Sequence, residues 1–478
     1  MPDPHHQIPT REKVLIIGAG PAGLAAAAAL KALEVPFDLV DRAAHVGGIW
    51  DPEREDSPVW PTMEMISSRE HTQYEDLLQP VSYPEFLSPG QMAKYLRAYA
   101  ARHDLTEHFR PRTAVRSARP FEEGVWQVEL STGEIGIYRA VISAHGISER
   151  PHLPGWAQEI PSSVQVMHSK DWKGADGLEG KRVLVVGSGQ SAADISVDAA
   201  RRALEVRWSM RTGHWVVPRR VAGIPGDVAA SREPSALGGL NQKIAETVIR
   251  RTVGDPVAAG LPAPQAGLLE DAVIVSDDVL DRVREGRVTP AGEVTGIAED
   301  GTITHRAAGS DTAQQTYAPD LIVLATGYES GADHLPQDVV PRTASGELDL
   351  FLGAFARGRD DLVILGQQRV SGGVLPILVE QADIAAYMMA ATREGAASDS
   401  PALAQFRRVR AGSESAVPAK PVARDGGLLG RLGGVLGAHR VTPRAAVTAG
   451  DDGAENLVPV ADRETLLARL RSVRGLFA

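Results

Sequence analysis

One stretch near the start of the chain decides the fold: Val14-Leu15-Ile16-Ile17-Gly18-Ala19-Gly20-Pro21-Ala22-Gly23. An apolar β-branched run leads into a glycine-rich turn, and the residues after the turn favour a helix. Gly18 allows the tight turn, Gly20 lets the backbone approach a pyrophosphate, and Gly23 allows the helix to pack closely on the strand. The order of strand, turn and helix predicts a dinucleotide cradle in which the helix N-terminus faces the phosphates.

A second strand follows this helix and ends at an acidic residue, in the run Phe37-Asp38-Leu39-Val40-Asp41. A carboxylate roughly 20 residues after the glycines is placed to accept hydrogen bonds from ribose hydroxyls. The alternative is a glycine-rich turn that binds no ligand. The complete order of strand, turn, helix, second strand and terminal acid favours the nucleotide site.

The same pattern recurs in the middle of the chain. Arg182 to Val186 predicts a strand, and the looser form of the glycine turn follows it as Gly187-Ser188-Gly189-Gln190-Ser191-Ala192. The next strand, Glu205 to Ser209, ends without an acid, and Arg207 and Arg211 lie there instead. Since arginine holds a ribose 2′-phosphate that an acid would repel, we expect NADPH rather than NADH. Arg211, past the strand end, is the better candidate. The alternative is that both arginines form a solvated surface.

Breaks in the pattern predict how the domains are arranged. A third apolar run, Leu321 to Ala325, stops at Thr326-Gly327-Tyr328, as a buried parallel strand stops at a ligand crevice. We predict an α/β fold with two Rossmann-like dinucleotide-binding domains, the second inserted into the first. The predicted bounds are 1–150 and 318–478 for the first domain, and 151–317 for the inserted domain, with a helical insertion at about 222–282. An irregular segment is expected at about 394–455.

Composition limits the function. The net charge of −11 argues against sequence-independent binding of nucleic acid, so a small-molecule partner is expected. No apolar run reaches the roughly 20 residues that span a bilayer, and the first segment lacks a signal-peptide pattern, so we expect a cytoplasmic protein without a membrane span. The chain has 0 cysteines, which excludes reductases that pass electrons through a protein dithiol.

Several segments together resemble the class B flavin-dependent monooxygenases, which include flavin-containing and Baeyer–Villiger monooxygenases. The likeness runs from about residue 13 to about 390 and is greatest to the flavin-containing type. The segments that carry it are Gly47-Gly48-Ile49-Trp50, Gly187 to Asp194, Arg211 to Arg219, Gly254 to Pro262, Ser276-Asp277 with Gly286, and Ala325-Thr326-Gly327-Tyr328.

The resemblance implies that FAD binds the first cradle and NADPH the second. It also implies that NADPH reduces the flavin and that dioxygen adds to the reduced ring. The flavin hydroperoxide would then give one oxygen atom to a nitrogen, sulfur or ketone of a small molecule. The residues expected at the two cofactors are Gly18, Gly20, Gly23, Asp41, Arg42, Gly48, Trp50, Gly187, Gly189, Gln190, Ser191, Arg211, Thr326, Gly327 and Gln381. No metal is expected.

The family motif F-x-G-x-x-x-H-x-x-x-W is only half present. His168 and Trp172 match it, but Ser162 and Val164 stand where Phe and Gly belong. His168 is expected to hold the interdomain hinge or to sense nicotinamide binding, and the alternative is an ordinary hydrogen-bonded linker histidine.

A second departure concerns the asparagine that this family commonly places beside the flavin. The corresponding stretch is Met63-Glu64-Met65-Ile66-Ser67-Ser68, and the chain's asparagines are Asn241 and Asn456. Ser67 or Ser68 would donate a hydrogen bond to the oxygen adduct in its place, or would be a plain polar residue of a turn.

Gln381 lies in a predicted helix after Gly372-Gly373, and the matching family segment packs by the flavin ring, with the helix N-terminus near it. The alternative is a plain amphipathic helix. For the whole chain, two further functions stay open. One is an NADPH oxidase or dehydrogenase without productive oxygen transfer, and the other is a nucleotide-binding redox sensor without turnover.

Overall fold

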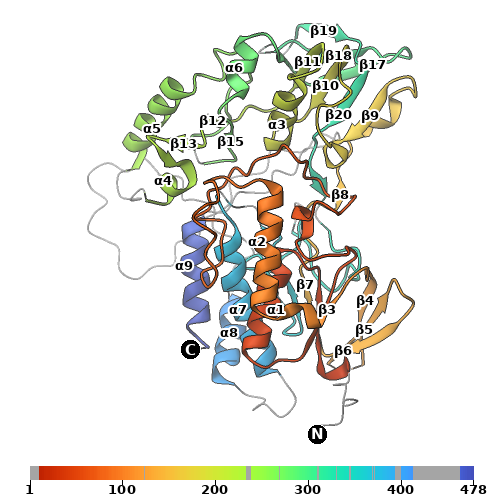
Figure 1. Ribbon diagram of the computed structural model, residues 1–478, viewed down its shortest axis with the longest axis vertical. Helices are drawn as coiled ribbons and strands as arrows, with labels where there is room; N and C mark the ends of the chain where they lie inside the picture. The colour runs from red at the N-terminus through yellow and green to blue at the C-terminus, as the bar shows by residue number, and fades with distance from the viewer. Residues whose placement is uncertain are drawn as a thin grey trace.

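The computed structural model describes residues 10–122, 124–232, 238–268, 270–308, 310, 312–329, 331–343, 346–368, 370, 372–392, 400–412 and 463–477. Two mainly parallel sheets organise the chain, one in each half of the molecule (Figure 1). The sheet that contains the first glycine turn, together with its helices, is called the first unit here, and the other sheet with its helices is called the second unit.

The first sheet has the strand order β22-β23-β24-β7-β1-β2-β3. Its strands are β1 (Val14–Ile17), β2 (Phe37–Val40), β3 (Phe109–Arg110), β7 (Ala140–Ser143), β22 (Leu350–Phe351), β23 (Phe355–Ala356) and β24 (Leu362–Ile364). β24, β7, β1, β2 and β3 pair in parallel, and β22 and β23 form an antiparallel edge. β1 is an apolar run buried along its whole length, as a strand covered on both faces requires.

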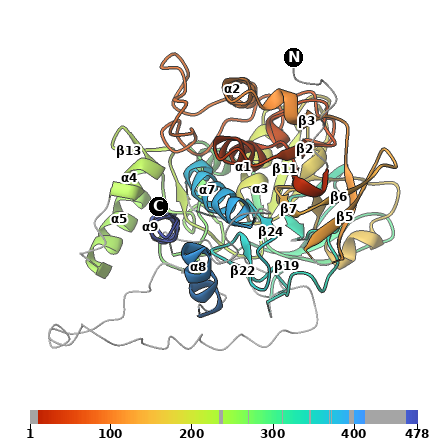
Figure 2. The ribbon, with the colours of Figure 1, turned by 90° about the horizontal axis from the view of Figure 1, so that it is seen from below.

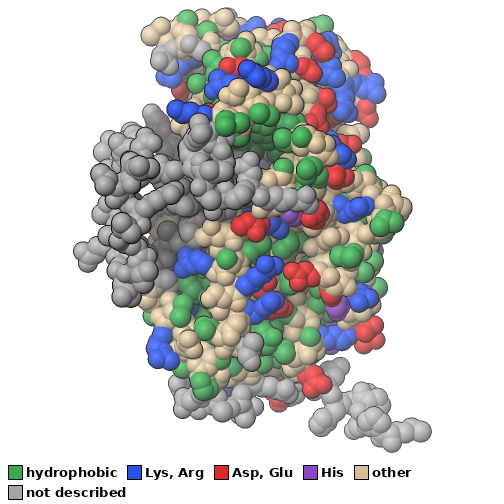
Figure 3. Space-filling view, turned by 90° about the vertical axis from the view of Figure 1, so that its left-hand side faces the viewer, with side chains coloured by type: hydrophobic (Ala, Val, Ile, Leu, Met, Phe, Trp, Pro, Cys, Tyr) green, Lys and Arg blue, Asp and Glu red, His purple; other side chains and the backbone are tan. Residues whose placement is uncertain are grey.

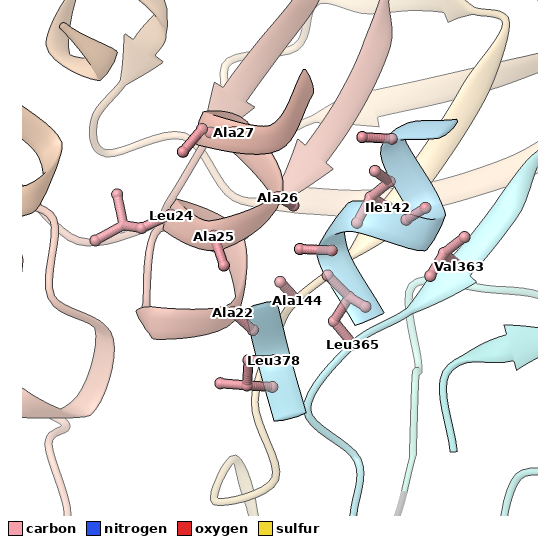
Figure 4. Packing of buried hydrophobic residues seen from close by; sticks show 14 of the residues in the cluster. Ala22, Leu24, Ala25, Ala26, Ala27, Ile142, Ala144, Val363, Leu365 and Leu378 are labelled. Atoms are coloured by element: carbon pink, nitrogen blue, oxygen red, sulfur yellow. The ribbon is translucent and has the colours of Figure 1, made fainter. Parts of the chain in front are cut away.

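Helices cover the first sheet (Figures 1 and 2). They are α1 (Pro21–Ala32), α2 (Pro89–Arg102), α7 (Leu375–Ala391), α8 (Pro401–Gly412) and α9 (Arg463–Arg474). The alanines of α1 present small side chains, which lets α7 and the central strands approach closely. Figure 4 shows Ala22, Ala25 and Ala26 beside Ile142 of β7 and Leu378 of α7, all within one buried apolar cluster.

The second sheet is parallel throughout, with the order β16-β11-β10-β20-β9. Its strands are β9 (Gln165–His168), β10 (Arg182–Val186), β11 (Glu205–Ser209), β16 (Thr289–Ala291) and β20 (Leu321–Leu324), and its helices include α3 (Gln190–Ala199) and α6 (Val279–Arg284). Both sheets match the predicted Rossmann-like pattern, because each contains a strand, a glycine turn and a helix in this order.

The sequence pattern placed the return from the inserted domain to the first domain at residue 318, but the chain rejoins the first sheet later. β20 lies between β10 and β9 of the second sheet, and the next strand of the first sheet is β22. An apolar run alone does not reveal which sheet a buried parallel strand joins. The outward and return crossings between the units pair with each other, as β8 (Arg150–Pro151) and β21 (Tyr328–Glu329).

Small sheets and short helices complete the described parts. The first unit adds β4 (Val115–Phe121), β5 (Val125–Leu130), β6 (Ile135–Tyr138), η1 (Thr10–Glu12), η2 (Gly48–Trp50) and η3 (Leu105–His108). The second adds β12 (Val216–Val217), β13 (Arg220–Val221), β14 (Ile224–Pro225), β15 (Ile274–Val275), β17 (Val294–Ile297), β18 (Ile303–Arg306), β19 (Gln314–Tyr317), α4 (Gly226–Arg232), α5 (Gly238–Thr252), η4 (Gly155–Glu159) and η5 (Ser169–Asp171). The expected helical insertion at 222–282 thus contains α4 and α5 but also β14 and β15.

Part of the segment 394–455 was wrongly expected to be irregular. Residues 401–412 form α8, whose Leu403 and Phe406 are buried in the main core one helical turn apart. The remaining described residue of that segment is residue 400, and the rest lies outside the described ranges. α9 then packs on α7, where Arg471 pairs with Glu380 at 3.0 Å. Within the described ranges, no helix is both long and apolar enough to cross a membrane.

Candidate functional site

The first glycine turn is a cradle built by close backbone packing. Gly18 has a φ of +101°, and a Cβ there would lie 2.4 Å from the carbonyl oxygen of Ala144. A Cβ on Gly23 would lie 1.8 Å from the carbonyl oxygen of Gly18, so the helix can approach the strand only with glycine at this position. α1 starts at Gly20, and no side chain caps it. The N–H groups of its first turn can therefore be offered to an anion.

This cradle opens into a cavity of about 540 Å³. At its centre Gly48, with a φ of +61°, lies against Gly20, and a Cβ on Gly48 would come within 2.8 Å of the Gly20 Cα. Its lining includes Asp41, residues that follow β24 and the start of α7. Trp50 and Arg42 also line the cavity, and the Arg42 guanidinium pairs with Asp56 at 2.8 Å.

Asp41 lies at the end of β2, where the sequence placed it. Its Oδ2 accepts a hydrogen bond from the Ala19 N–H at 2.7 Å, and its Oδ1 accepts one from the Ala43 N–H at 2.8 Å. These bonds fix a buried carboxylate at the cavity wall. Each carboxylate oxygen keeps a further lone pair, so ribose hydroxyls can still donate to it.

The second cradle repeats the geometry of the first. Gly187 has a φ of +142°, and a Cβ there would lie 2.2 Å from the carbonyl oxygen of Ala325. α3 has Gly189 as its N-cap with no side-chain cap, and a Cβ on Gly189 would meet nothing within 4 Å. Gly146 and Gly327 follow the two alanines and share φ values of +87° and +85°. Residues 144–146 thus repeat the pattern of residues 325–327, where the sequence predicted that a strand stops at a ligand crevice.

Around the second cradle, some side chains are held by contacts within the protein and others are exposed to solvent. The side-chain amide of Gln190 is bound to the backbone of Val275, from which it accepts a hydrogen bond at 2.8 Å and to which it donates one at 2.9 Å. Ser191 is exposed. Arg211 is exposed beyond β11, and its backbone N–H donates to Ser188 at 3.3 Å. Arg207 instead lies over the Tyr317 ring at 4.2 Å, away from the strand end.

Asp194, one turn into α3, is a titratable group that the sequence reasoning missed. Its carboxylate accepts a hydrogen bond from Gln190 Nε2 at 2.9 Å. Burial raises the pKa of Asp194 to about 7, because its charge is poorly solvated. No spacing in the sequence distinguishes this residue from the other polar positions of the helix.

His168 lies at the crossing between the two units, where both of its ring nitrogens are hydrogen-bonded to the backbone. The Lys170 N–H donates to its Nδ1 at 3.1 Å, so Nε2 carries the proton and donates to the carbonyl oxygen of Gly327 at 3.0 Å. Burial lowers the pKa of His168 and keeps the ring neutral. Thr326 Oγ1 likewise donates to the His152 carbonyl. These side chains hold the crossing between the units and do not line the cavity.

Ser67 and Ser68 differ in what they can do. Ser67 lines the cavity, whereas Ser68 donates its N–H and its hydroxyl to Asp227 Oδ2 at 2.7 and 2.9 Å. Thr72 Oγ1 donates to the Ser68 carbonyl at 2.6 Å, so its 3.0 Å contact with Ser67 requires the Ser67 hydroxyl to be the donor. Ser68 therefore cannot face the cavity, and Ser67 presents lone pairs there unless its hydroxyl turns away from Thr72.

Gln381 does not line the cavity, which corrects its expected position at the ring. It donates to the Leu352 carbonyl at 3.0 Å and to Gln368 Oε1 at 3.3 Å, and Gln368 is the residue at the cavity wall. Leu375, in the first turn of α7, does line the cavity, as expected for that helix N-terminus. Gln368 was missed because it lies in an irregular segment without a pattern.

The two units meet around the loop that carries Ser67. Trp60 of this loop is buried in an apolar cluster of the second unit. Ion pairs join Glu64 to Arg219 and Glu85 to Arg220. On the described part of the face shown in Figure 3, acidic and basic side chains are interspersed rather than gathered into a basic patch.

Comparison with known proteins agrees with this geometry. A family model described as flavin-binding monooxygenase-like matches residues 11–400. The human flavin-containing monooxygenase 5 is 26% identical over 392 residues, which cover 77% of this chain and 71% of the relative. The rice indole-3-pyruvate monooxygenase YUCCA1 is 27% identical over 323 residues, which cover 66% of this chain and 76% of the relative.

Solved structures are similar in fold. A flavin monooxygenase variant from Stenotrophomonas maltophilia aligns with a TM-score of 0.60 at 20% identity, covering 79% of this chain and 98% of that one. A complex of OTEMO with FAD and NADP aligns with a TM-score of 0.61 at 21% identity, covering 80% and 84%. These likenesses confirm the predicted α/β class with Rossmann-like units.

Proposed function

Because the chain belongs to the flavin-binding monooxygenase-like family, we propose that it binds FAD in the first cradle and NADPH in the second, as an oxidoreductase of the monooxygenase type. We further propose that it transfers one atom of dioxygen to a nitrogen, sulfur or ketone of a small molecule. The resemblance found in the sequence is thereby confirmed at the level of the family. The observation that carries the proposal is a pair of uncapped helix N-termini with matching glycine geometry, one of which opens into the cavity.

The residues of the first unit fit FAD. The N–H groups at the start of α1 would hold the pyrophosphate, with Gly20 and Gly48 leaving space for it. Asp41 would accept hydrogen bonds from the ribose. The flavin ring would lie towards Leu375 and Leu378 at the other end, where apolar walls exclude water.

The residues of the second unit fit NADPH. The start of α3 offers uncapped N–H groups, and Gly189 leaves open space beside them. Arg211, exposed at the end of β11, would bind the 2′-phosphate. We propose that this unit includes β20, so that its end lies after Leu324 rather than at residue 317.

Bound flavin would supply the redox chemistry, by accepting a hydride from the nicotinamide and by reacting with dioxygen. In the balanced reaction, one oxygen atom enters the substrate and the other leaves as water, while NADPH becomes NADP⁺. The protein's own part is to place the two nucleotides and to keep water from the ring. Met63, Met65 and Ile66 add apolar surface to the cavity for this purpose.

An NADPH oxidase is the second candidate, and a specific observation favours it. Ser68 is bound to Asp227, and Ser67 uses its donor on Thr72, so neither serine replaces the family asparagine directly. A ring environment with fewer donors would release more hydrogen peroxide. The redox-sensor alternative has no comparable observation in its favour.

One experiment separates these functions. Purified protein is assayed for FAD content, and NADPH consumption, oxygen consumption, peroxide and product are measured together with a tertiary amine, a thioether or a cyclic ketone. The monooxygenase predicts product formation coupled to NADPH for at least one substrate class. Peroxide equal to the NADPH consumed, with no product from any probe, would establish the oxidase instead. Protein that binds no FAD would overturn both.

A further inference from the structure

A tight turn beside the cavity makes room for one glutamine. Leu352 and Gly353 join β22 to β23 with φ values of +49° and +65°. A Cβ on Gly353 would lie 2.0 Å from the side-chain carbon Cδ of Gln368. Leucine rarely adopts a positive φ, so the turn holds a strained residue next to the cavity. The Gln368 side chain therefore occupies a space that only glycine at 353 leaves open.

The hydrogen bonds around this turn fix which way the Gln368 amide faces. A carbonyl oxygen can only accept, so the atom of Gln381 that lies 3.0 Å from the Leu352 oxygen must be the donor Nε2. The same Nε2 donates to Gln368 at 3.3 Å, and the atom that receives it must be Oε1. Gln368 Nε2 therefore points away from Gln381. The Leu352 carbonyl thus sets the orientation of both side-chain amides.

Gln368 Nε2 is buried and has no hydrogen-bond partner within the described part of the chain. A buried donor without a partner costs about 1–3 kcal/mol, and native proteins rarely leave one unless a ligand or water completes it. Gln368 lines the cavity together with Gly366 and Leu378. The missing acceptor is therefore expected on the molecule that fills the cavity.

The sheet order indicates which part of that molecule lies there. β24 and β2 lie on opposite sides of β1 in the order β24-β7-β1-β2. Asp41 follows β2 at the ribose end, and the α1 cradle follows β1 at the pyrophosphate. Gln368 follows β24, so the ring end of the dinucleotide extends towards it.

We propose that Gln368 is a flavin-recognition residue, whose Nε2 donates a hydrogen bond to an acceptor atom of the isoalloxazine ring. Gln381 and Leu352 are positioning residues that act through Gln368. This inference rests on the proposed binding of FAD in the first cradle. Because reduction makes the ring more electron-rich, a donor to one of its acceptors stabilises the reduced state more than the oxidised state.

The test uses the holoenzyme of Gln368→Met, which keeps the length of the side chain and removes the donor. We expect FAD to dissociate about three- to tenfold more readily, the range for one neutral hydrogen bond. We also expect a more negative flavin midpoint potential. A residue that only filled space would weaken both redox states equally and leave the potential unchanged.

Gln367→Met is the matched control. Gln367 is the adjacent residue, donates to the Gly146 carbonyl at 3.3 Å and does not line the cavity. The FAD dissociation constant of this variant should stay within about twofold of the parent's, since its hydrogen bond is only partly buried. Its flavin midpoint potential should stay unchanged. An effect as large as that of Gln368→Met would overturn the proposal.

Three further variants keep the test decisive. Gln368→Glu keeps Oε1 for Gln381 and replaces the donor with an acceptor, so it should weaken FAD binding more than Gln368→Met, and it also serves if the methionine variant does not fold. Gln381→Leu should weaken FAD binding in the same direction, and the double variant Gln381→Leu/Gln368→Met should be no worse than Gln368→Met alone. Additive losses, or unchanged FAD binding and potential in both Gln368 variants, would refute the proposal. A parent protein that binds no FAD would instead refute the proposed function.

Discussion

Asp227 is expected to lock the cavity loop of the first unit to the second unit. Its carboxylate, on α4, accepts both hydrogen bonds that Ser68 can donate and lies 3.4 Å from His71 Nδ1. The Asp227 side chain is 6% exposed. The perturbation is Asp227→Ala, which removes the acceptor and leaves the Ser68 N–H and hydroxyl without a partner in a buried site.

The magnitude follows from these contacts. Each unpaired buried donor costs about 1–3 kcal/mol, and the Ser68 hydroxyl can partly relieve its loss by rotating. We expect Asp227→Ala to lower the free energy of unfolding by about 2–4 kcal/mol. Asp227→Asn keeps one acceptor oxygen and should cost about half as much. The exposed pair of Glu64 and Arg219 joins the same two units, so Glu64→Gln is the control and should cost less than about 1 kcal/mol.

The pH dependence gives an independent check. Burial raises the pKa of Asp227, but hydrogen bonds from His71 and Ser68 outweigh it and hold the pKa below its ordinary value of 3.8. A lowered pKa means that the contribution of the carboxylate is complete above about pH 4 and is lost as the pH falls through the folded-state pKa. The difference between parent and Asp227→Asn should therefore shrink as the pH falls below about 4.

The measurements are urea unfolding and amide hydrogen exchange of the holoenzyme. Exchange at the Ser68 amide should accelerate in Asp227→Ala while exchange in β1 changes only with global stability. The reasoning fails if Asp227→Ala unfolds within about 0.5 kcal/mol of the parent and the Ser68 amide exchanges at the parent rate. It also fails if Glu64→Gln is equally destabilising.

Further predictions concern the cofactors. Gly20→Val should give folded protein without FAD, whereas Gly187→Val should keep FAD and lose reduction by NADPH, because each added side chain disrupts only its own cradle. Bound flavin and anaerobic reduction are measured. Loss of FAD in Gly187→Val would contradict the assignment. Arg211→Ala should raise the KM for NADPH roughly tenfold and leave that for NADH nearly unchanged, since only NADPH carries the 2′-phosphate; equal changes would mark a structural arginine. Ser67→Ala should change the ratio of peroxide to product less than twofold, because its donor is bound to Thr72, and a large rise in peroxide at an unchanged rate of flavin reduction would show that the hydroxyl turns to the ring.

The sequence was sufficient to predict those parts of the structure that depend on residues near one another in the chain. Strand, glycine turn and helix follow one another within β1 and α1, and the steric reason for each glycine can be stated before any fold is known. Asp41 was found by the same logic, since it ends the very next strand. The half-present motif around His168 lies at the crossing between the units, where the ring is hydrogen-bonded to Lys170 and Gly327.

The sequence was insufficient where a side chain meets a distant partner. Ser67 and Ser68 are adjacent and similar, but one lines the cavity and the other binds Asp227, which lies 159 residues away. Gln381 and Gln368 show the same effect, because the register of α7 and the turn after β22 decide which of them reaches the wall. Local propensity contains no information on such contacts.

The two cradles also show why similar turns would bind different nucleotides. In both, an alanine carbonyl at the end of a neighbouring strand presses on the first glycine, from Ala144 to Gly18 and from Ala325 to Gly187. This shared contact fixes the backbone that faces a pyrophosphate, which is common to both cofactors. The difference lies at the end of the next strand, where the first unit has Asp41 bound to two backbone N–H groups and the second has Met210 at the matching position, followed by Arg211. Because an acid favours bare ribose hydroxyls and an arginine favours a phosphate, the acid at this position of the first unit, and its absence from the second, where the exposed Arg211 follows, account for the proposed division between FAD and NADPH.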